Sequence, residues 1–131
     1  MANGAMMLDY RYAIVRVVPR AERDECINVG IIVFVPSSGY LAARIATNLD
    51  LVRALAPQTD LAALRTSLTA VELICAGSRV GGPAAVESAS FRFGHLTAPR
   101  STMVRTSGTH GGIAEDPDDA LNELYARYVA R

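Results

Sequence analysis

The feature that most constrains the fold is an apolar run that begins directly after a polar segment. In "DECINVGIIVFV", Asp24–Val35, acidic and amide residues lead into seven consecutive apolar or glycine residues, Val29–Val35. A membrane-spanning helix needs about 20 apolar residues, so this run is too short to cross a bilayer. Its β-branched content is typical of a strand that is buried on both faces. We therefore predict a central strand over Ile27–Val35.

Three other segments are predicted to be strands. "LDYRYAIVRVV", Leu8–Val18, is rich in β-branched and aromatic residues, and its alternation places Arg16 on the same face as Tyr10 and Tyr12. "PSSGY" supplies a proline and a glycine that suit a hairpin before the third strand, Leu41–Ala46. A fourth segment, 102–106, is predicted to be an edge strand.

Helix signals follow the first three strands. "NLDLVRALAP" predicts a short helix, and Asp60 and Gly77 have the residue types that begin and end a longer one. The small residues of 78–90 indicate a surface loop, and "SGTHGG" indicates a flexible one. The last helix is predicted to begin at Asp116, because a capping carboxylate and a first-turn proline stand together there.

The order of these elements predicts an α+β fold. The strands cluster early and do not alternate with helices, so we expect a three- or four-stranded, mainly antiparallel sheet with helices packed on one face. A chain of 131 residues suits one domain. We predict a disordered extension over 1–7 and a single α+β domain over 8–131. Because the sequence starts without the pattern of a secretory signal, we expect a cytoplasmic protein.

Charge and cysteine usage limit the classes of ligand. Thirteen basic and thirteen acidic residues give a formal net charge of zero, so nucleic acid is an unlikely partner. Every basic residue is an arginine, which fits anionic ligands such as phosphate, although a genome rich in G and C would produce the same bias. No spacing of cysteine and histidine suggests a metal ligand set, and no cofactor motif is present.

The first candidate site surrounds the start of the central strand. Arg16 lies on an otherwise apolar strand face and needs a partner, because an unpaired buried charge is costly. Glu25 can hold that arginine, the Asn28 amide can bind neighbouring backbone, and Gly30 allows another chain or a ligand to come close. The other interpretation is a purely structural pair of Arg16 and Glu25 that fixes the hairpin register.

The second candidate site is the segment "FGHLTAPRST". Arg100, Ser101 and the threonine that follows them can surround a phosphate or carboxylate, or the segment can be only a turn. His95 and Thr97 resemble one half of the paired His-x-Thr/Ser signature of two-histidine phosphoesterases. The other half is missing, because "THG" at residues 109–111 has no hydroxyl after the histidine.

Taken together, the quoted residues resemble a known bacterial family. "YRYAIVRVVPRAERDECINVGIIVF", with "LTAPRST" downstream and an amphipathic last helix, is similar to the Domain of Unknown Function 3037 family from about Asp9 to Val129. The resemblance implies no established activity. It implies an accessory role, because members are often encoded beside a protein of HipA-like kinase fold. The positions that match the family are Arg16, Glu25, Asn28, Gly30, Arg100 and Ser101.

Two functional hypotheses follow from the sequence, beside a third option in which the domain is purely structural or oligomerising and has no cleft at the two motifs. The first is an accessory or binding module, without catalysis of its own, that engages a protein partner and a phosphate-bearing ligand. The second is an enzyme acting on a phosphoester or nucleotide, in which Arg100 holds the phosphate, His95 moves protons and Glu25 positions Arg16. The enzyme hypothesis requires His95, Arg100 and Glu25 to meet in one cleft.

Overall fold

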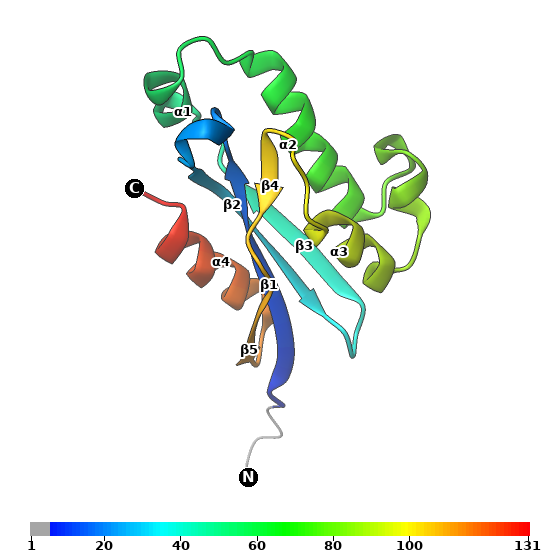
Figure 1. Cartoon of the computed structure of the whole chain (residues 1–131). Helices are drawn as coiled ribbons and strands as arrows, with labels where there is room; N and C mark the ends of the chain where they lie inside the picture. The colour runs from blue at the N-terminus through cyan, green and yellow to red at the C-terminus, as the bar shows by residue number, and fades with distance from the viewer. Residues whose placement is uncertain (1–5) are drawn as a thin grey trace.

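The computed structural model, which describes residues 6–131, contains one antiparallel sheet between two layers of helices (Figure 1). The strands of this part of the chain lie in the order β3-β2-β1-β4, and β5 pairs with the same edge of β1 as β4 does. Their bounds are β1 Leu8–Val17, β2 Ile27–Val35, β3 Tyr40–Ile45, β4 Val104–Thr106 and β5 His110–Ala114. The predicted extension over 1–7 falls mainly on residues 1–5, which lie outside the described residues.

β4 and β5 together form one interrupted edge of the sheet. β4 pairs with Val15–Val17 and β5 pairs with Leu8–Tyr12, so the two short strands follow one another along β1. Ser107 bridges the interruption: its hydroxyl accepts a hydrogen bond from the Ile14 amide and its own amide donates to the Ile14 carbonyl, both at 2.8 Å. One buried side chain thus replaces part of the missing ladder.

The helices begin and end where capping chemistry predicts. α2 spans Leu61–Ala76; the Asp60 carboxylate accepts a hydrogen bond from the Ala63 amide at 3.0 Å, and Gly77 ends the helix with a φ of 71°. In α4, Pro117–Tyr128, Asp116 caps the first turn. The remaining helical segments are α1 Asp50–Leu55, α3 Ala89–Thr97 and the 3-10 turns Ala21–Arg23, Arg79–Gly81 and Pro83–Val86.

Helices cover both faces of the sheet. α2 and α3 pack against one face, where Ile32 and Phe34 of β2 are buried, and α4 packs against the other face, over Ile31 and Val33 (Figure 1). The predicted α+β class and antiparallel pairing are confirmed. The sheet has five strands in the described residues rather than three or four, and the helices are not confined to one face. A one-sided arrangement would leave the second apolar face of β2 in water.

Two segments differ from the sequence prediction. α3 was not predicted, because its short apolar face is interrupted by Gly94; it is capped by the Ser88 hydroxyl, which accepts from the Phe91 amide at 3.2 Å. Part of "SGTHGG", predicted to be flexible, is the start of β5. There the ring of Tyr10 occupies the space that a side chain at Gly112 would need, so the glycine suits the strand.

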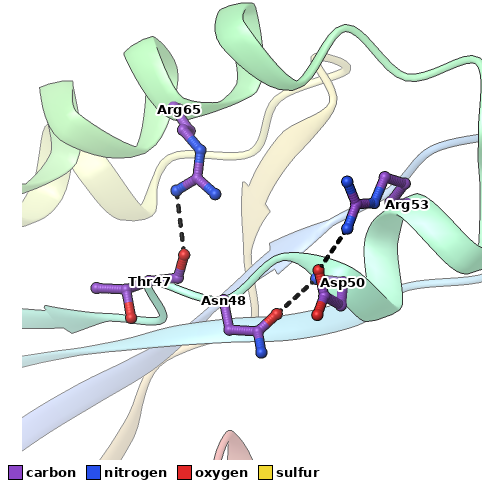
Figure 2. Close-up of polar contacts among 5 residues, drawn as sticks. All are labelled: Thr47, Asn48, Asp50, Arg53 and Arg65. Carbon is purple, nitrogen blue, oxygen red and sulfur yellow. Dashed lines mark hydrogen bonds and ion pairs between the residues drawn. The ribbon is translucent and has the colours of Figure 1, made fainter.

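Polar contacts fix α1 and α2 against the end of β3 (Figure 2). The Asn48 side chain accepts a hydrogen bond from the Asp50 amide at 2.8 Å and so starts α1. Arg53 donates to the Asp50 carboxylate at 2.8 Å, one turn along the same helix. Arg65 of α2 donates to the Thr47 carbonyl at 3.1 Å, which ties α2 to the connection between β3 and α1.

Candidate functional site

A β-bulge shapes the start of β2. Val15 opposes Gly30 and Arg16 opposes Asn28, so Val29 is the extra residue without a partner on β1. A Cβ at Gly30 would lie 2.5 Å from Ile45 Cδ1 and 3.0 Å from the Arg44 carbonyl oxygen. The Ile45 side chain of β3 therefore fills the space beside Gly30. The sequence analysis had predicted that another chain or a ligand could come close there.

Asn28 connects three parts of the chain. Arg16 donates from Nε to Asn28 Oδ1 at 3.4 Å, and Asn28 donates from Nδ2 to the Tyr128 carbonyl at 3.1 Å. Arg131 lies beside the same strand and donates to the Asn28 carbonyl at 3.5 Å. Asn28 therefore links β1 to the C-terminal end of α4, and Arg16 lies on the α4 side of the sheet.

A second arginine lies opposite the first. Arg105 of β4 is the direct cross-strand partner of Arg16, and it donates to the carbonyls of Thr102 at 2.7 Å and Ser101 at 3.3 Å. The ion pairs among residues 6–131 involve other arginines, Arg23 and Arg53. Like charges directly opposite one another destabilise a strand pair. We call Arg16, Asn28 and Arg105 the arginine site.

Glu25 does not contact Arg16. It forms an ion pair with Arg23, two residues earlier in the same turn, and both side chains are exposed. The turn brings these two groups together before β2 begins, whereas Arg16 projects toward α4. Glu25 and Cys26 line a cavity of about 300 Å³ beside Leu55, and this cavity shares no lining residue with the surroundings of Arg100.

The side chains of the second candidate site mainly make contacts within α3 or with its C-terminal end. Arg100 donates to the His95 carbonyl at the end of that helix. The Thr97 hydroxyl donates to the Phe93 carbonyl at 2.8 Å, within the helix. The ring of His95 stacks on Phe91 with centroids 6.3 Å apart. Thr97 is therefore engaged by its own helix.

The two predicted polar segments meet only in part. The Ser101 carbonyl lies against Arg105, so the Pro-Arg-Ser turn reaches the strand position opposite Arg16. Arg100 is directed instead toward His95, and both line a cavity of about 330 Å³ between α2, α3 and β4. Most of that lining is apolar. His95 and Arg100 thus share a cavity, and Glu25 lies in another.

Sequence reasoning missed Arg105. The residue lies inside the segment that was predicted to be an edge strand, but its partner depends on which strand that segment joins and in what register. The alternation of β1 had already placed Arg16 on one face. Only the pairing of β4 with Val15–Val17 shows that the two arginines oppose each other.

The fold and the site define a small α+β protein with a sheet between two helical layers and a pair of arginines at one end of its first strand. The chain belongs to the family described as protein of unknown function (DUF3037), whose model matches residues 12–129. Searches among curated proteins and among solved structures give no significant match.

Across residues 6–131, no helix is both long enough and apolar enough to cross a membrane. In the same residues no three His, Cys, Asp or Glu side chains are grouped as metal ligands.

Proposed function

We propose that the protein is a small binding module that holds an anionic group, a phosphate or a carboxylate, at the arginine site. The observation that supports this most is the direct opposition of Arg16 and Arg105, neither of which is among the ion pairs of the described residues. An anion between the two guanidinium groups would offset their repulsion. Arginine suits this role because its fork of N–H donors matches carboxylate and phosphate oxygens.

The site has donors left for a ligand. A guanidinium carries five N–H donors. The hydrogen bonds of the arginine site use one donor group of Arg16, toward Asn28, and two of Arg105, toward backbone carbonyls. These contacts hold the two side chains in place, so an anion would meet groups that are already oriented.

Calorimetric titration with inorganic pyrophosphate tests the proposal. Arg105→Gln and Arg16→Gln are each expected to weaken binding by about 1.5–3 kcal/mol, the usual contribution of a charged hydrogen bond, which is roughly tenfold or more in affinity. Arg79→Gln is the matched control, because Arg79 is exposed on a 3-10 turn beside α2. Equal binding by all three variants would contradict the proposal.

An accessory role beside a protein of HipA-like kinase fold is a second element of the proposal. It is supported by the family resemblance and needs its own test. The two purified proteins are mixed at concentrations well above micromolar and separated by size. Co-elution is expected; separate elution at those concentrations would remove the partner from the proposal.

Hydrolysis of a phosphoester or nucleotide is less well supported. That reaction needs His95, Arg100 and Glu25 in one cleft, and Glu25 lines a different cavity. The hydroxyl of Thr97 is bonded within α3 and the Arg100 guanidinium is bonded to the His95 carbonyl. Binding without catalysis is therefore the function that the geometry supports best.

A further inference from the structure

Aromatic side chains lie on the same sheet face as the arginine site. α4 buries Leu121 and Leu124 against Ile14, Ile31 and Val33, whereas Tyr10 and Tyr12 of β1 stay half-buried and His110 of β5 stays exposed. Four rings line the uncovered part, and we call them the aromatic strip: Tyr10, Tyr12, His110 and Tyr128. Tyr12 and Arg16 are four residues apart on β1, which is about 13 Å along a strand.

Tyr12 is the centre of the strip. Its ring centroid lies 5.3 Å from that of His110, which opposes it on β5, and 6.2 Å from those of Tyr10 and Tyr128. The Tyr10 ring lies across Gly112, where a side chain would collide with it. With no side chain beneath it, this ring can lie flat against the sheet. His110 is exposed and the three tyrosines are half-buried.

An arginine lies at the Tyr128 end of the strip. Arg127 lies beside the Tyr128 ring, with its guanidinium carbon 5.9 Å from the ring centroid. Hydrogen bonds from Tyr12 and Arg127 lower the pKa of Tyr128, while the hydrogen bond to Tyr128 and burial raise the pKa of Tyr12 to about 12. Tyr12 is therefore a neutral ring at physiological pH.

The strands carry no acidic side chain on this part of the face. The side chains that alternate onto it from β1, β4 and β5 carry no carboxylate between Tyr10 and Arg16 or at the positions opposite them. On α4, Asp118 is bonded to the Tyr40 hydroxyl on the β3 side, and Glu123 stands one turn before Arg127. The strands of this face therefore present arginines without a carboxylate between them, although the whole chain has a formal net charge of zero.

We infer that this face binds single-stranded nucleic acid, with bases stacked on the aromatic strip and phosphates at the arginine site. The inference rests on the proposed function, because the arginine site supplies the phosphate contacts. Every base has a π-face, so aromatic platforms beside a positive groove bind single strands with little sequence preference. A duplex hides those faces in its own stack, so it can use only the arginines.

Fluorescence anisotropy with the full chain tests the inference. The probes are labelled (dT)8 and a labelled abasic chain of the same length and charge. Tyr12→Leu keeps apolar bulk but removes the stacking face, and it is expected to weaken (dT)8 binding about tenfold, as loss of one base–aromatic stack does. Arg105→Gln is expected to weaken binding of both probes and to reduce the slope of log affinity against log salt by about 0.7. Arg79→Gln should change neither.

The outcomes separate the two proposals. If the abasic chain binds as tightly as (dT)8 and Tyr12→Leu changes nothing, the stacking inference is overturned while the anion site stands. If neither probe binds and pyrophosphate also fails, both proposals fall. Tighter binding of duplex, or of a phosphorylated peptide of equal charge, also overturns the inference. Should Tyr12→Leu fail to fold, His110→Ala replaces an exposed ring of the same strip and carries the same expectation.

Discussion

Replacement of Gly30 by alanine gives a direct test of how tightly β2 and β3 are packed. An added Cβ would lie 2.5 Å from Ile45 Cδ1, 3.0 Å from the Arg44 carbonyl oxygen and 3.3 Å from Val15 Cβ. The Ile45 methyl can rotate away at a cost of about 0.5–1.5 kcal/mol. The carbonyl can move only if the β2–β3 ladder shifts. Overpacking of this kind costs about 1–3 kcal/mol, and we expect about 2 kcal/mol of lost stability.

Urea unfolding followed by circular dichroism measures this loss. With an m-value of about 2 kcal/mol/M, typical of a small domain, the midpoint should fall by about 1 M. Gly94→Ala is the control, because a Cβ there meets nothing within 4 Å and the residue lies inside α3. Alanine in a helix without such a clash stabilises by about 0.5–1 kcal/mol, so the two substitutions should have opposite signs.

A double variant identifies the colliding atom. Ile45→Val removes Cδ1 and alone should cost about 0.5–1.5 kcal/mol. In the double variant Gly30→Ala/Ile45→Val the two losses should fall short of additivity by about 0.5 kcal/mol or more, because the valine vacates the contested space. Unchanged stability in Gly30→Ala, or strict additivity in the double variant, would refute the packing argument.

Three other predictions concern single groups. Ser107→Ala leaves the Ile14 amide without its partner and should cost about 1–3 kcal/mol in the free energy of unfolding, measured by the same urea titration. Burial raises the pKa of the Cys75 thiol to about 12. A thiol reagent should therefore modify only the exposed Cys26 in the folded protein, and both thiols after unfolding. Rapid modification of both thiols in the native state would contradict this prediction. The hydrogen bond to Tyr128 and burial raise the pKa of Tyr12 to about 12 from an ordinary value of 10.0. The stability that this neutral phenol contributes to the fold is therefore full below pH 10 and is lost as pH rises toward 12. In Tyr12→Phe the alkaline loss should be smaller, and an identical pH profile would show that the phenol is not responsible.

The parts of the fold that sequence predicts well are those with local chemical signals. The long helix was bounded correctly by Asp60 and Gly77, and the last helix by Asp116, because caps act within one turn. The strand Ile27–Val35 followed from its β-branched run. α3 escaped prediction, since its buried residues, Phe93 and Leu96, form too short a stripe to show a helical period.

The site was predictable only where it depends on neighbouring strands. A hairpin between β1 and β2 brings Arg16 to the start of β2, as the sequence predicted, but its partner there is Asn28 rather than the expected Glu25. Glu25 lies just before the ladder, where a nearer arginine in the turn takes its carboxylate. Arg105 reaches the site through pairing across about ninety residues of chain. Such long-range pairing leaves no local signal.

The division of the outer edge into β4 and β5 has a consequence for the protein in a crowded cell. A continuous exposed edge offers a row of free amides and carbonyls on which another chain can add as a strand, and this is a common route to aggregation. Here the edge consists of pieces of three and five residues, separated at Ser107. Neither piece is a long template, so this edge of the sheet is poorly suited to the addition of another strand.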